Sequence, residues 1–202
     1  MAAVPALLAA AFALGLAAGP STAAAFAVYL AVAWAYSLWL KHLLWADLLA
    51  LAGLYALRVL AGAEAARRGW PEWPVAFAFA AFLALATVKR LTALARTSDE
   101  GPLPGRAYRR ADRPAVLAVG LGGTLVAVAT FLIYSFTAEA GALYSHHWLL
   151  RLAAVPIAGW LLRMLFRAWK GEEDYDPLVF VAHDRVGLAI AAVGLALFAL
   201  AV

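Results

Sequence analysis

Long runs of apolar residues alternate with short polar or charged clusters along almost the entire chain. A helix that crosses the hydrocarbon core of a membrane needs about 20 apolar residues, and ~17 can suffice. The first and fourth of these runs are short, which favours tilted or partly irregular helices. The pattern therefore predicts an all-α fold, a polytopic transmembrane bundle of about seven helices. The predicted helices cover residues 4–19, 22–40, 45–62, 74–89, 115–136, 148–168 and 178–202.

Prolines mark several boundaries between these runs. Pro20 separates the first two runs, and Pro71 and Pro74 bracket the start of the fourth. Asp176 followed by Pro177 is typical of a helix N-cap with proline at the first helical position. The last run is therefore expected to begin there.

Composition supports membrane insertion. Of the 202 residues, 66% are hydrophobic and 14% are charged, whereas soluble domains carry about 25% charged residues. A soluble fold of this size would expose far too much apolar surface. We therefore treat residues 1–202 as a single transmembrane domain. The net charge of +4 does not indicate nucleic-acid binding, because basic residues in membrane proteins mostly mark cytoplasmic loops.

The basic residues are unequally divided between the two sides of the predicted bundle. Twelve of the 16 Lys and Arg residues fall at the loops after the second, fourth and sixth helices, and three fall on the opposite side. By the positive-inside rule the first set is cytoplasmic, and a cell inner membrane is expected. Residues 1–25 also resemble a signal peptide. Since they lack a basic n-region, a retained helix is favoured.

Acidic residues gather on the same predicted side, which therefore carries both charges. Nine of the 12 Asp and Glu residues fall there, among them Asp47 and Asp184, which lie inside helices near the membrane boundary. Ionisable residues at such positions are costly and often functional. Lys and Arg hold phosphate oxygens, and carboxylates hold Mg²⁺ that bridges to phosphates. The alternative is that these charges form no site, because cytoplasmic loops are charged in any membrane protein.

Five segments, taken in order, resemble a known family. Residues 36–47, "YSLWLKHLLWAD", resemble the Tyr-Ser-x-x-Leu-Lys…Asp segment of the UbiA superfamily of intramembrane prenyltransferases. "LRVLAGAEA" (57–65) and "VKRLTAL" (88–94) are similar to segments that follow it. "GRAYRRADRPAVLAVG" (105–120) and "DPLVFVAHDRVG" (176–187) match later ones. The resemblance covers residues 30–190 and points to the branch of decaprenyl-phosphate phosphoribosyltransferase.

The resemblance implies a Mg²⁺-dependent transferase that moves a prenyl or phosphoribosyl group on polyprenyl phosphate or diphosphate substrates held among membrane lipid. It implies catalytic roles for Tyr36, Asp47 and Asp112. It further implies that phosphate is bound by Lys41, Lys89, Arg90 and Arg109, and metal by Asp112, Asp176 and Asp184. Each of these residues also has a structural explanation: a snorkelling lysine, a helix cap or a positive-inside anchor.

The sequence departs from the family pattern in two places. The family has nine helices, and the first two are missing here together with their Asn-Asp-x-x-Asp-x-x-x-Asp motif, since the chain has no asparagine. Ala93 also stands where relatives carry glutamate, and Leu91 where they carry tyrosine. The alternatives are a truncated product, half of a split enzyme that needs a complementary N-terminal subunit, or a degenerate lipid-binding paralogue without turnover.

A small transporter is a further alternative. It predicts a polar residue at the bilayer midplane and an internal repeat, and neither is clear in the sequence. His146 and His147 lie on the opposite side from the proposed chemistry without a third ligand. They are treated as surface residues.

Overall fold

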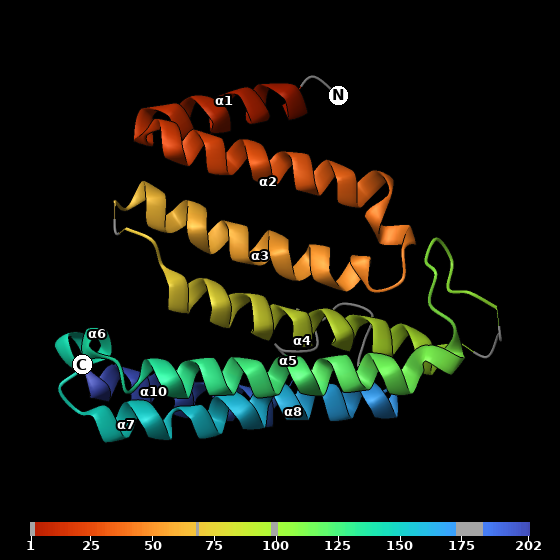
Figure 1. The fold of residues 1–202 in the computed structure, drawn as a ribbon. Coiled ribbons are helices and arrows are strands. Elements are labelled where there is room, and N and C mark those ends of the chain that lie inside the picture. Colours follow the sequence, from red (N-terminus) through yellow and green to blue (C-terminus); the bar gives the residue numbers. More distant parts are fainter. Residues whose placement is uncertain (1–2, 68, 98–100, 173–183) are drawn as a thin grey trace.

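The structure is a computed structural model that describes residues 3–67, 69–97, 101–172 and 184–202. All regular structure in these residues is helical, which confirms the predicted all-α bundle. Figure 1 shows most of the long helices running side by side. The helices are α1 (Ala3–Ala18), α2 (Pro20–Leu38), α3 (Ala46–Ala65), α4 (Glu72–Arg96), α5 (Arg113–Tyr134), α6 (Ala138–Leu143), α7 (His147–Leu152), α8 (Ala154–Lys170) and α10 (Arg185–Ala201).

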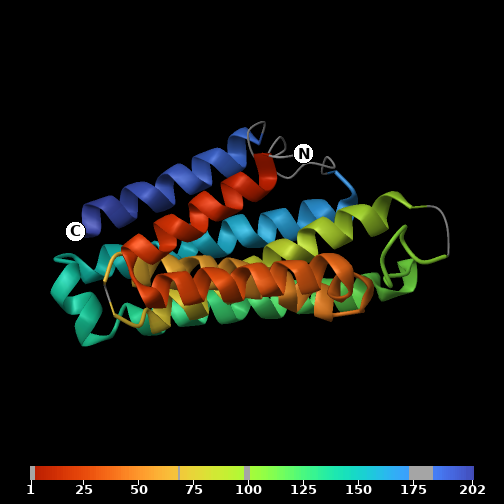
Figure 2. The same ribbon diagram turned by 90° about the horizontal axis from the view of Figure 1, so that it is seen from above.

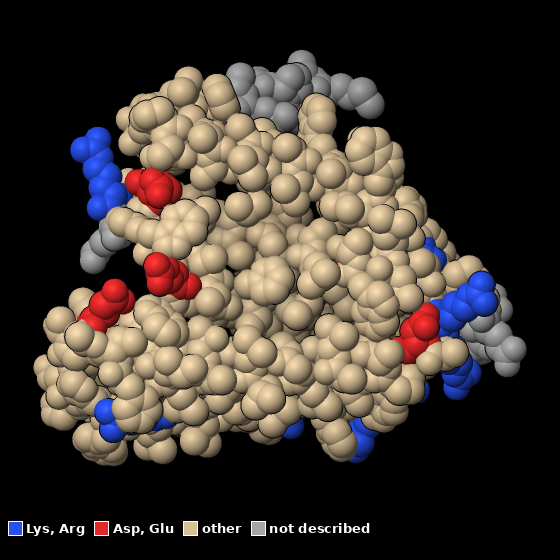
Figure 3. Space-filling model, in the orientation of Figure 1, with Lys and Arg blue, Asp and Glu red and all other residues tan. Residues whose placement is uncertain are grey.

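Five segments of the described chain are long and apolar enough to cross a membrane, and the protein is a multi-pass membrane protein. They correspond to α2, α3, α4, α5 with the turn before it, and α7 joined to α8. Large apolar side chains such as Leu14, Leu125 and Leu195 are about 70% exposed. In Figure 3 most charged atoms lie toward the two ends, with a largely uncharged band between them. This surface suits contact with lipid.

The predicted spans overlap the helices but differ from them in four places. The last described helix begins at Arg185 and not at residue 178, so Asp184 is its N-cap and does not lie inside it. The predicted start at Asp176 and Pro177 lies outside the described residues. The short helix α6 has no predicted counterpart.

The fourth helix continues to Arg96, because one side of residues 90–96 is still buried and no proline or glycine interrupts it. The predicted 148–168 helix is divided at Ala153 into α7 and α8. Pro156 explains the break, since its nitrogen cannot donate to the carbonyl of Leu152.

α4 is the central helix, and it packs against α3, α5 and α8. α1 packs mainly on α2, and α10 packs on α7 and α8. Seen from above, α1 and α10 lie on the same side of the layer that contains α2, α3 and α5 (Figure 2). The bundle is therefore an open arrangement built outward from α4.

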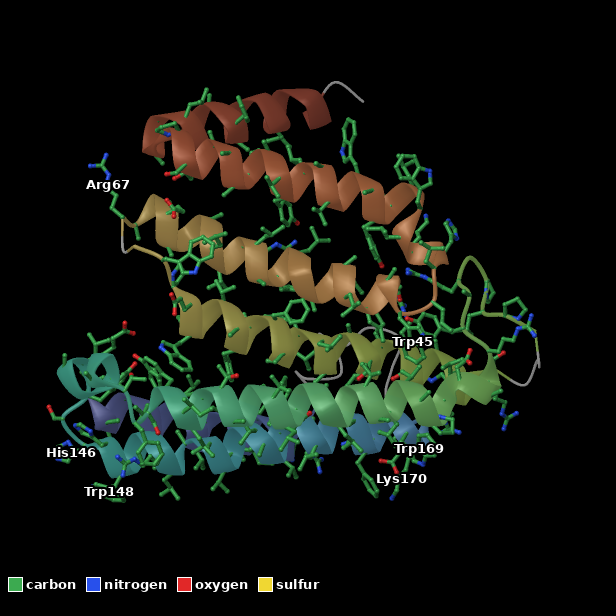
Figure 4. The ribbon with its side chains drawn as sticks, viewed as in Figure 1. Trp45, Arg67, His146, Trp148, Trp169 and Lys170 are labelled. Atoms are coloured by element: carbon green, nitrogen blue, oxygen red, sulfur yellow. The ribbon has the colours of Figure 1, made fainter. Side chains whose placement is uncertain are left out.

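The two ends of the bundle are distinguished by the side chains that they carry. Trp45, Trp169 and Lys170 lie at one end in Figure 4, and Arg67, His146 and Trp148 lie at the other. The first end holds the C-terminal ends of α2, α4 and α8, as the predicted alternation of helices requires. We call it the basic end.

Candidate functional site

Four segments of the chain meet at the carboxylate of Asp47, at the basic end of the bundle. Asp47 lies in the first turn of α3 and is completely buried. Tyr36 reaches it from the last turn of α2, Arg90 from α4, and Arg106 from the loop between α4 and α5. We call Tyr36, Asp47, Arg90 and Arg106 the Asp47 cluster. The cluster connects residues up to 70 positions apart in the sequence.

The carboxylate accepts hydrogen bonds on both oxygens. Arg90 donates from Nε to Oδ2 at 2.5 Å and from Nη2 to Oδ1 at 2.9 Å, a bidentate pair. Tyr36 donates its hydroxyl hydrogen to Oδ1 at 3.1 Å, and Arg106 donates to the same oxygen from Nη1. The same nitrogen of Arg106 donates to the Tyr36 hydroxyl oxygen at 3.0 Å.

Among the described residues, the Asp47 cluster has an excess of positive charge, because two guanidinium groups share one carboxylate. The side chain of Arg90 is 6% exposed, whereas that of Arg106 is 22% exposed. Burying charge is costly unless it is paired, and a buried site with one cation in excess favours an anionic ligand. Arg106 is the member that a ligand from outside reaches most easily.

The loop after α4 is held against α3 by Tyr108, which is fully buried. The Tyr108 ring meets Trp45 edge to face at 6.3 Å between centroids, and the Tyr108 carbonyl accepts a hydrogen bond from Leu103 at 2.8 Å. Burial, with a contribution from the negative charge of Asp47, raises the pKa of Tyr108 to about 12. The phenol is therefore neutral at physiological pH.

Backbone strain lies two residues before Asp47. Trp45, at the N-cap of α3, has φ of 69°, which is uncommon for a bulky residue. Such a conformation costs about 1–3 kcal/mol and persists where the surroundings impose it. Trp45 packs against the buried cluster that contains Leu48 and Tyr108. The packing of Trp45 therefore holds the start of α3, and with it Asp47, in place.

The structure brings three of the predicted site residues together and leaves others apart. Tyr36, Asp47 and Arg90 belong to the Asp47 cluster. Lys89 is exposed on α4, although it precedes Arg90, because neighbours on a helix point about 100° apart. Lys41 is partly exposed in the short 3₁₀ turn Leu40–His42.

Arg109 and Asp112 form a local capping arrangement. The backbone nitrogen of Arg109 donates to Oδ2 of Asp112 at 2.8 Å. Arg109 is exposed and Asp112 is partly exposed. This contact orders the turn that precedes α5.

Asp184 forms a second ionic group, at the N-cap of α10. Arg163 of α8 donates to it from Nη2 to Oδ1 at 2.7 Å and from Nε to Oδ2 at 2.9 Å. Arg167 adds an ion pair from Nη1 at 3.5 Å. The hydrogen bonds from Arg163 lower the pKa of Asp184 to about 2, against the opposing effect of burial.

The predicted metal ligands are not assembled within the part of the chain that the structure describes. Asp112 caps a turn, Asp184 pairs with arginines, and Asp176 lies outside the described residues. No three His, Asp or Glu residues gather in the described ranges. Both described carboxylates that are buried, Asp47 and Asp184, already have guanidinium partners.

Sequence reasoning missed Arg106 and Arg163. Arg106 was counted only as a loop cation, although the quoted segment 105–120 contains it. Arg163 carried a usable signal, because it is an ionisable residue inside a predicted span. Neither partner is close in sequence, so only the fold identifies the carboxylate that each one meets.

An apolar groove of about 700 Å³ lies between α4, α8 and α10. Its walls include Phe77 and Leu85 of α4, Trp160 of α8 and Phe198 of α10. Three residues with hydroxyl groups, Thr130, Tyr134 and Tyr144, are also among its lining residues. The groove has the character of a site for an apolar chain.

No protein-family model matches the chain. It is similar to the uncharacterized protein y4nM of Sinorhizobium fredii, with 27% identity over 177 residues, 86% of this chain. It is also similar to the nodulation protein NoeC of Azorhizobium caulinodans, with 30% identity over 153 residues, 75% of this chain. The matched regions span 34% and 50% of these two relatives, so both relatives are considerably longer than the matched segment.

Proposed function

We propose that this chain is a UbiA-like membrane transferase, or part of one, that moves a prenyl or phosphoribosyl group on a polyprenyl phosphate or diphosphate. The observation that carries the proposal is the Asp47 cluster. It gathers two guanidinium groups around one buried carboxylate at the basic end of a lipid-embedded bundle. A phosphate group is one of the anions whose geometry matches the arginine fork.

Arg106 and Arg90 have different roles in this proposal. Arg90 is fixed by its bidentate pair with Asp47 and supplies a permanent positive charge. Arg106 contacts Asp47 through Nη1 alone, so within the described residues its Nε and Nη2 are available to a phosphate oxygen. When a diphosphate leaves, the charge that develops on its oxygens is stabilised by these guanidinium groups.

Tyr36 positions Arg106 in the same proposal. Its hydroxyl donates to Asp47 and accepts from Arg106. The ring of Tyr36 also lies 5.8 Å from the Arg106 guanidinium carbon. Tyr36 therefore holds the more accessible arginine in the direction of Asp47.

The apolar groove is proposed to hold the isoprenoid chain. Its lining is almost entirely apolar and its volume of about 700 Å³ suits a prenyl tail. Leu85 lines the groove, and Arg90 follows five residues later on α4. That separation is about 7.5 Å along the helix axis and a turn of about 140° around it. The groove therefore lies one level away from the Asp47 cluster and mainly on another face of α4.

Mg²⁺ remains part of the proposal only as an ion that arrives with the phosphorylated substrate. The described carboxylates do not by themselves fit a Mg²⁺ site, because the buried ones are paired with arginines. Mg²⁺ is commonly held by one or two carboxylates together with substrate phosphates. Bound there, it would neutralise phosphate charge, while the residues of this chain bind and orient the anion.

The basic end is proposed to face the cytoplasm of a cell whose inner membrane holds the protein. The support is the predicted excess of Lys and Arg at that end, since positively charged loops are retained inside. The substrate phosphate would then be bound at the inner leaflet.

The alternative is a non-catalytic protein that binds isoprenoid lipid, or half of a split enzyme that needs a complementary N-terminal subunit. One observation favours this alternative. Both carboxylate oxygens of Asp47 accept hydrogen bonds from arginines, so this carboxylate is already paired. The greater length of both relatives is compatible with a missing portion.

Binding is the first test. The chain is placed in phosphatidylcholine nanodiscs, and the dissociation constants of geranylgeranyl diphosphate and of a polyprenyl phosphate are measured. Arg106→Gln should weaken binding about tenfold or more, because a charge-assisted hydrogen bond contributes ~1.5–3 kcal/mol. Arg110→Gln is the matched control, since Arg110 is exposed beside the same loop and outside the Asp47 cluster. Equal effects of both substitutions, or no binding at all, would contradict the proposal.

Turnover is the second test. Transfer of the prenyl or phosphoribosyl group is measured with Mg²⁺, with and without the additional region of a longer relative supplied as a separate chain. Transfer that Arg90→Gln abolishes supports the transferase. Binding without transfer in both conditions supports the non-catalytic alternative.

A further inference from the structure

A second groove, of about 730 Å³, lies over α8 between α5 and α10, apart from the Asp47 cluster. Leu117 and Leu121 of α5 line one side, and Leu162 and Phe166 of α8 line the floor. Leu121, Leu162 and Phe166 are 44–58% exposed, so this wall faces the surroundings of the bundle. The two grooves share one lining residue, Ile190 of α10.

Cations surround this second groove where it approaches the basic end. Arg163 is part of its lining. Arg113 lies one helical turn before Leu117, and its guanidinium stands 4.3 Å over the ring of the lining residue Trp169. The ammonium group of Lys170 lies 4.5 Å over the ring of Phe166. Figure 4 places Trp169 and Lys170 together at that end.

The cations at this end of the groove differ in how closely they are paired with carboxylates of the described residues. Arg163 and Arg167 pair with Asp184, and Arg167 and Lys170 lie near Glu172. Glu172 is 48% exposed and lies 3.8 Å from Lys170, so water screens that pair. Within the described residues, Arg113 has no carboxylate at ion-pair distance, and Lys170 has only this screened pair.

The guanidinium of Arg113 has a hydrogen-bond donor that is not used within the described residues. Arg113 donates from Nη2 to the backbone carbonyl oxygen of Trp169. Its Nε is buried and has no hydrogen-bond partner within the part of the chain that the structure describes. A buried donor without a partner costs free energy, and Arg113 stands beside the groove through its contact with the lining residue Trp169.

We propose that this groove is a binding site for one anionic phospholipid of the surrounding membrane. The phosphate lies among Arg113, Lys170 and Arg163, and the acyl chains lie along Leu117, Leu121 and Leu162. Trp169 stands at the level of the headgroup, where tryptophan is favoured. Basic pockets between membrane-spanning helices are known to take anionic headgroups.

An anionic phospholipid fits both parts of the groove. A free phosphate would use the cations but leave the apolar wall of α5 and α8 exposed. A neutral phospholipid would cover that wall but offer no net negative charge to Arg113 and Lys170. The site does not depend on the proposed transferase function, because none of its residues belongs to the Asp47 cluster.

The test compares lipids of equal chain length. The full chain in neutral detergent receives dioleoyl phosphatidylglycerol or dioleoyl phosphatidylcholine, and native mass spectrometry and thermal unfolding report binding. Phosphatidylglycerol should be retained about tenfold more than phosphatidylcholine, because each nearby cation favours an anionic lipid by ~1 kcal/mol. It should also raise Tm by about 4 °C.

Matched variants locate the site. Arg113→Gln combined with Lys170→Gln should abolish most of the preference for phosphatidylglycerol. Arg109→Gln combined with Arg110→Gln removes two exposed cations at the same end and should leave it unchanged. Equal losses in both pairs, or no preference in the wild-type protein, would overturn the proposal.

A second test does not depend on Arg113, because substitution of that residue could also impair folding. Leu121→Trp fills the groove without touching any charge and should prevent lipid retention. Leu125→Trp, one turn further along α5 at a position 70% exposed and outside the lining, is the control. If inorganic phosphate alone gives the same thermal stabilisation as phosphatidylglycerol, the groove does not bind a lipid and the proposal is wrong.

Discussion

Gly123 of α5 lies so close to Ala80 of α4 that a Cβ atom on the glycine would stand 2.9 Å from the Ala80 carbonyl oxygen. The same Cβ would stand 3.1 Å from the backbone nitrogen of Ala84. Both obstacles are backbone atoms, so neither can move without shifting a helix. The tight approach of α4 and α5 is therefore set by the missing side chain.

Gly123→Ala should destabilise the bundle. Forcing the two helices apart costs about 1–3 kcal/mol, the usual range for overpacking. Gly122→Ala is the matched control, because nothing lies within 4 Å of its added Cβ. The control should be neutral or stabilising by up to about 1 kcal/mol, the helix propensity gain. Thermal unfolding in detergent measures both, and equal Tm values would contradict this account of the packing.

Asp47→Asn should cost about 3–5 kcal/mol, since it leaves the buried Arg90 and the partly exposed Arg106 without their carboxylate. Glu139→Gln removes an exposed carboxylate and should change the unfolding free energy by less than about 0.5 kcal/mol. Adding Arg90→Met to Asp47→Asn should recover part of the loss, because one unpaired cation is then absent. A double variant less stable than the single one would argue against this pairing.

The raised pKa of Tyr108 predicts that the protein loses stability at high pH. This pKa is about 12, above the ordinary value of 10.0. The folded state therefore holds the phenolic proton more tightly than the unfolded state does. The resulting stability is complete below pH 10 and is lost as pH rises toward 12. Ultraviolet titration of tyrosinate should show a late-ionising residue that Tyr108→Phe removes.

The Tyr108→Phe variant should fold normally at neutral pH. The Tyr108 hydroxyl is buried without a hydrogen-bond partner in the described part of the chain, so its removal leaves no donor unpaired. A strong loss of stability at pH 7 would show that the hydroxyl has an essential partner.

The lowered pKa of Asp184 predicts a loss of stability at low pH. Its pKa is lowered from 3.8 to about 2, so its contribution to stability is complete above pH 3.8 and is lost as pH falls through 2. The difference corresponds to about 2 kcal/mol. The unfolding free energy of the wild-type protein minus that of Asp184→Asn should be constant from pH 5 to 7 and shrink below pH 4. A change between pH 5 and 7 would contradict the assignment.

Hydropathy alone predicted the fold class and the approximate position of each long helix. Apolar runs of membrane length fix which residues must be helical, because no other backbone arrangement satisfies its hydrogen bonds in lipid. Pro156 indicates the division between α7 and α8 locally, but the predicted span 148–168 runs through it without a break. The length of α4 beyond residue 89 depends on burial against other helices, which the hydropathy pattern does not report.

The candidate site could be predicted only in part, because its contacts join distant segments. Asp47 and Arg90 are 43 residues apart, and their pairing depends on how α3 packs against α4. Lys89 and Arg90 are equivalent cations in the sequence, and packing alone decides that Arg90 is buried. Arg106 meets Asp47 because Tyr108 folds the intervening loop back onto α3.

The Asp47 cluster also fixes the vertical register of the bundle. Apolar helices can slide past one another along the membrane normal at little cost, since lipid resembles their own side chains. A slip of α3 against α4 by one turn, about 5.4 Å, would separate Asp47 from both guanidinium groups. The carboxylate and the two guanidinium groups would then be unpaired at the edge of the hydrocarbon. One aspartate thereby sets a common depth for α2, α3 and α4 once each helix has been inserted.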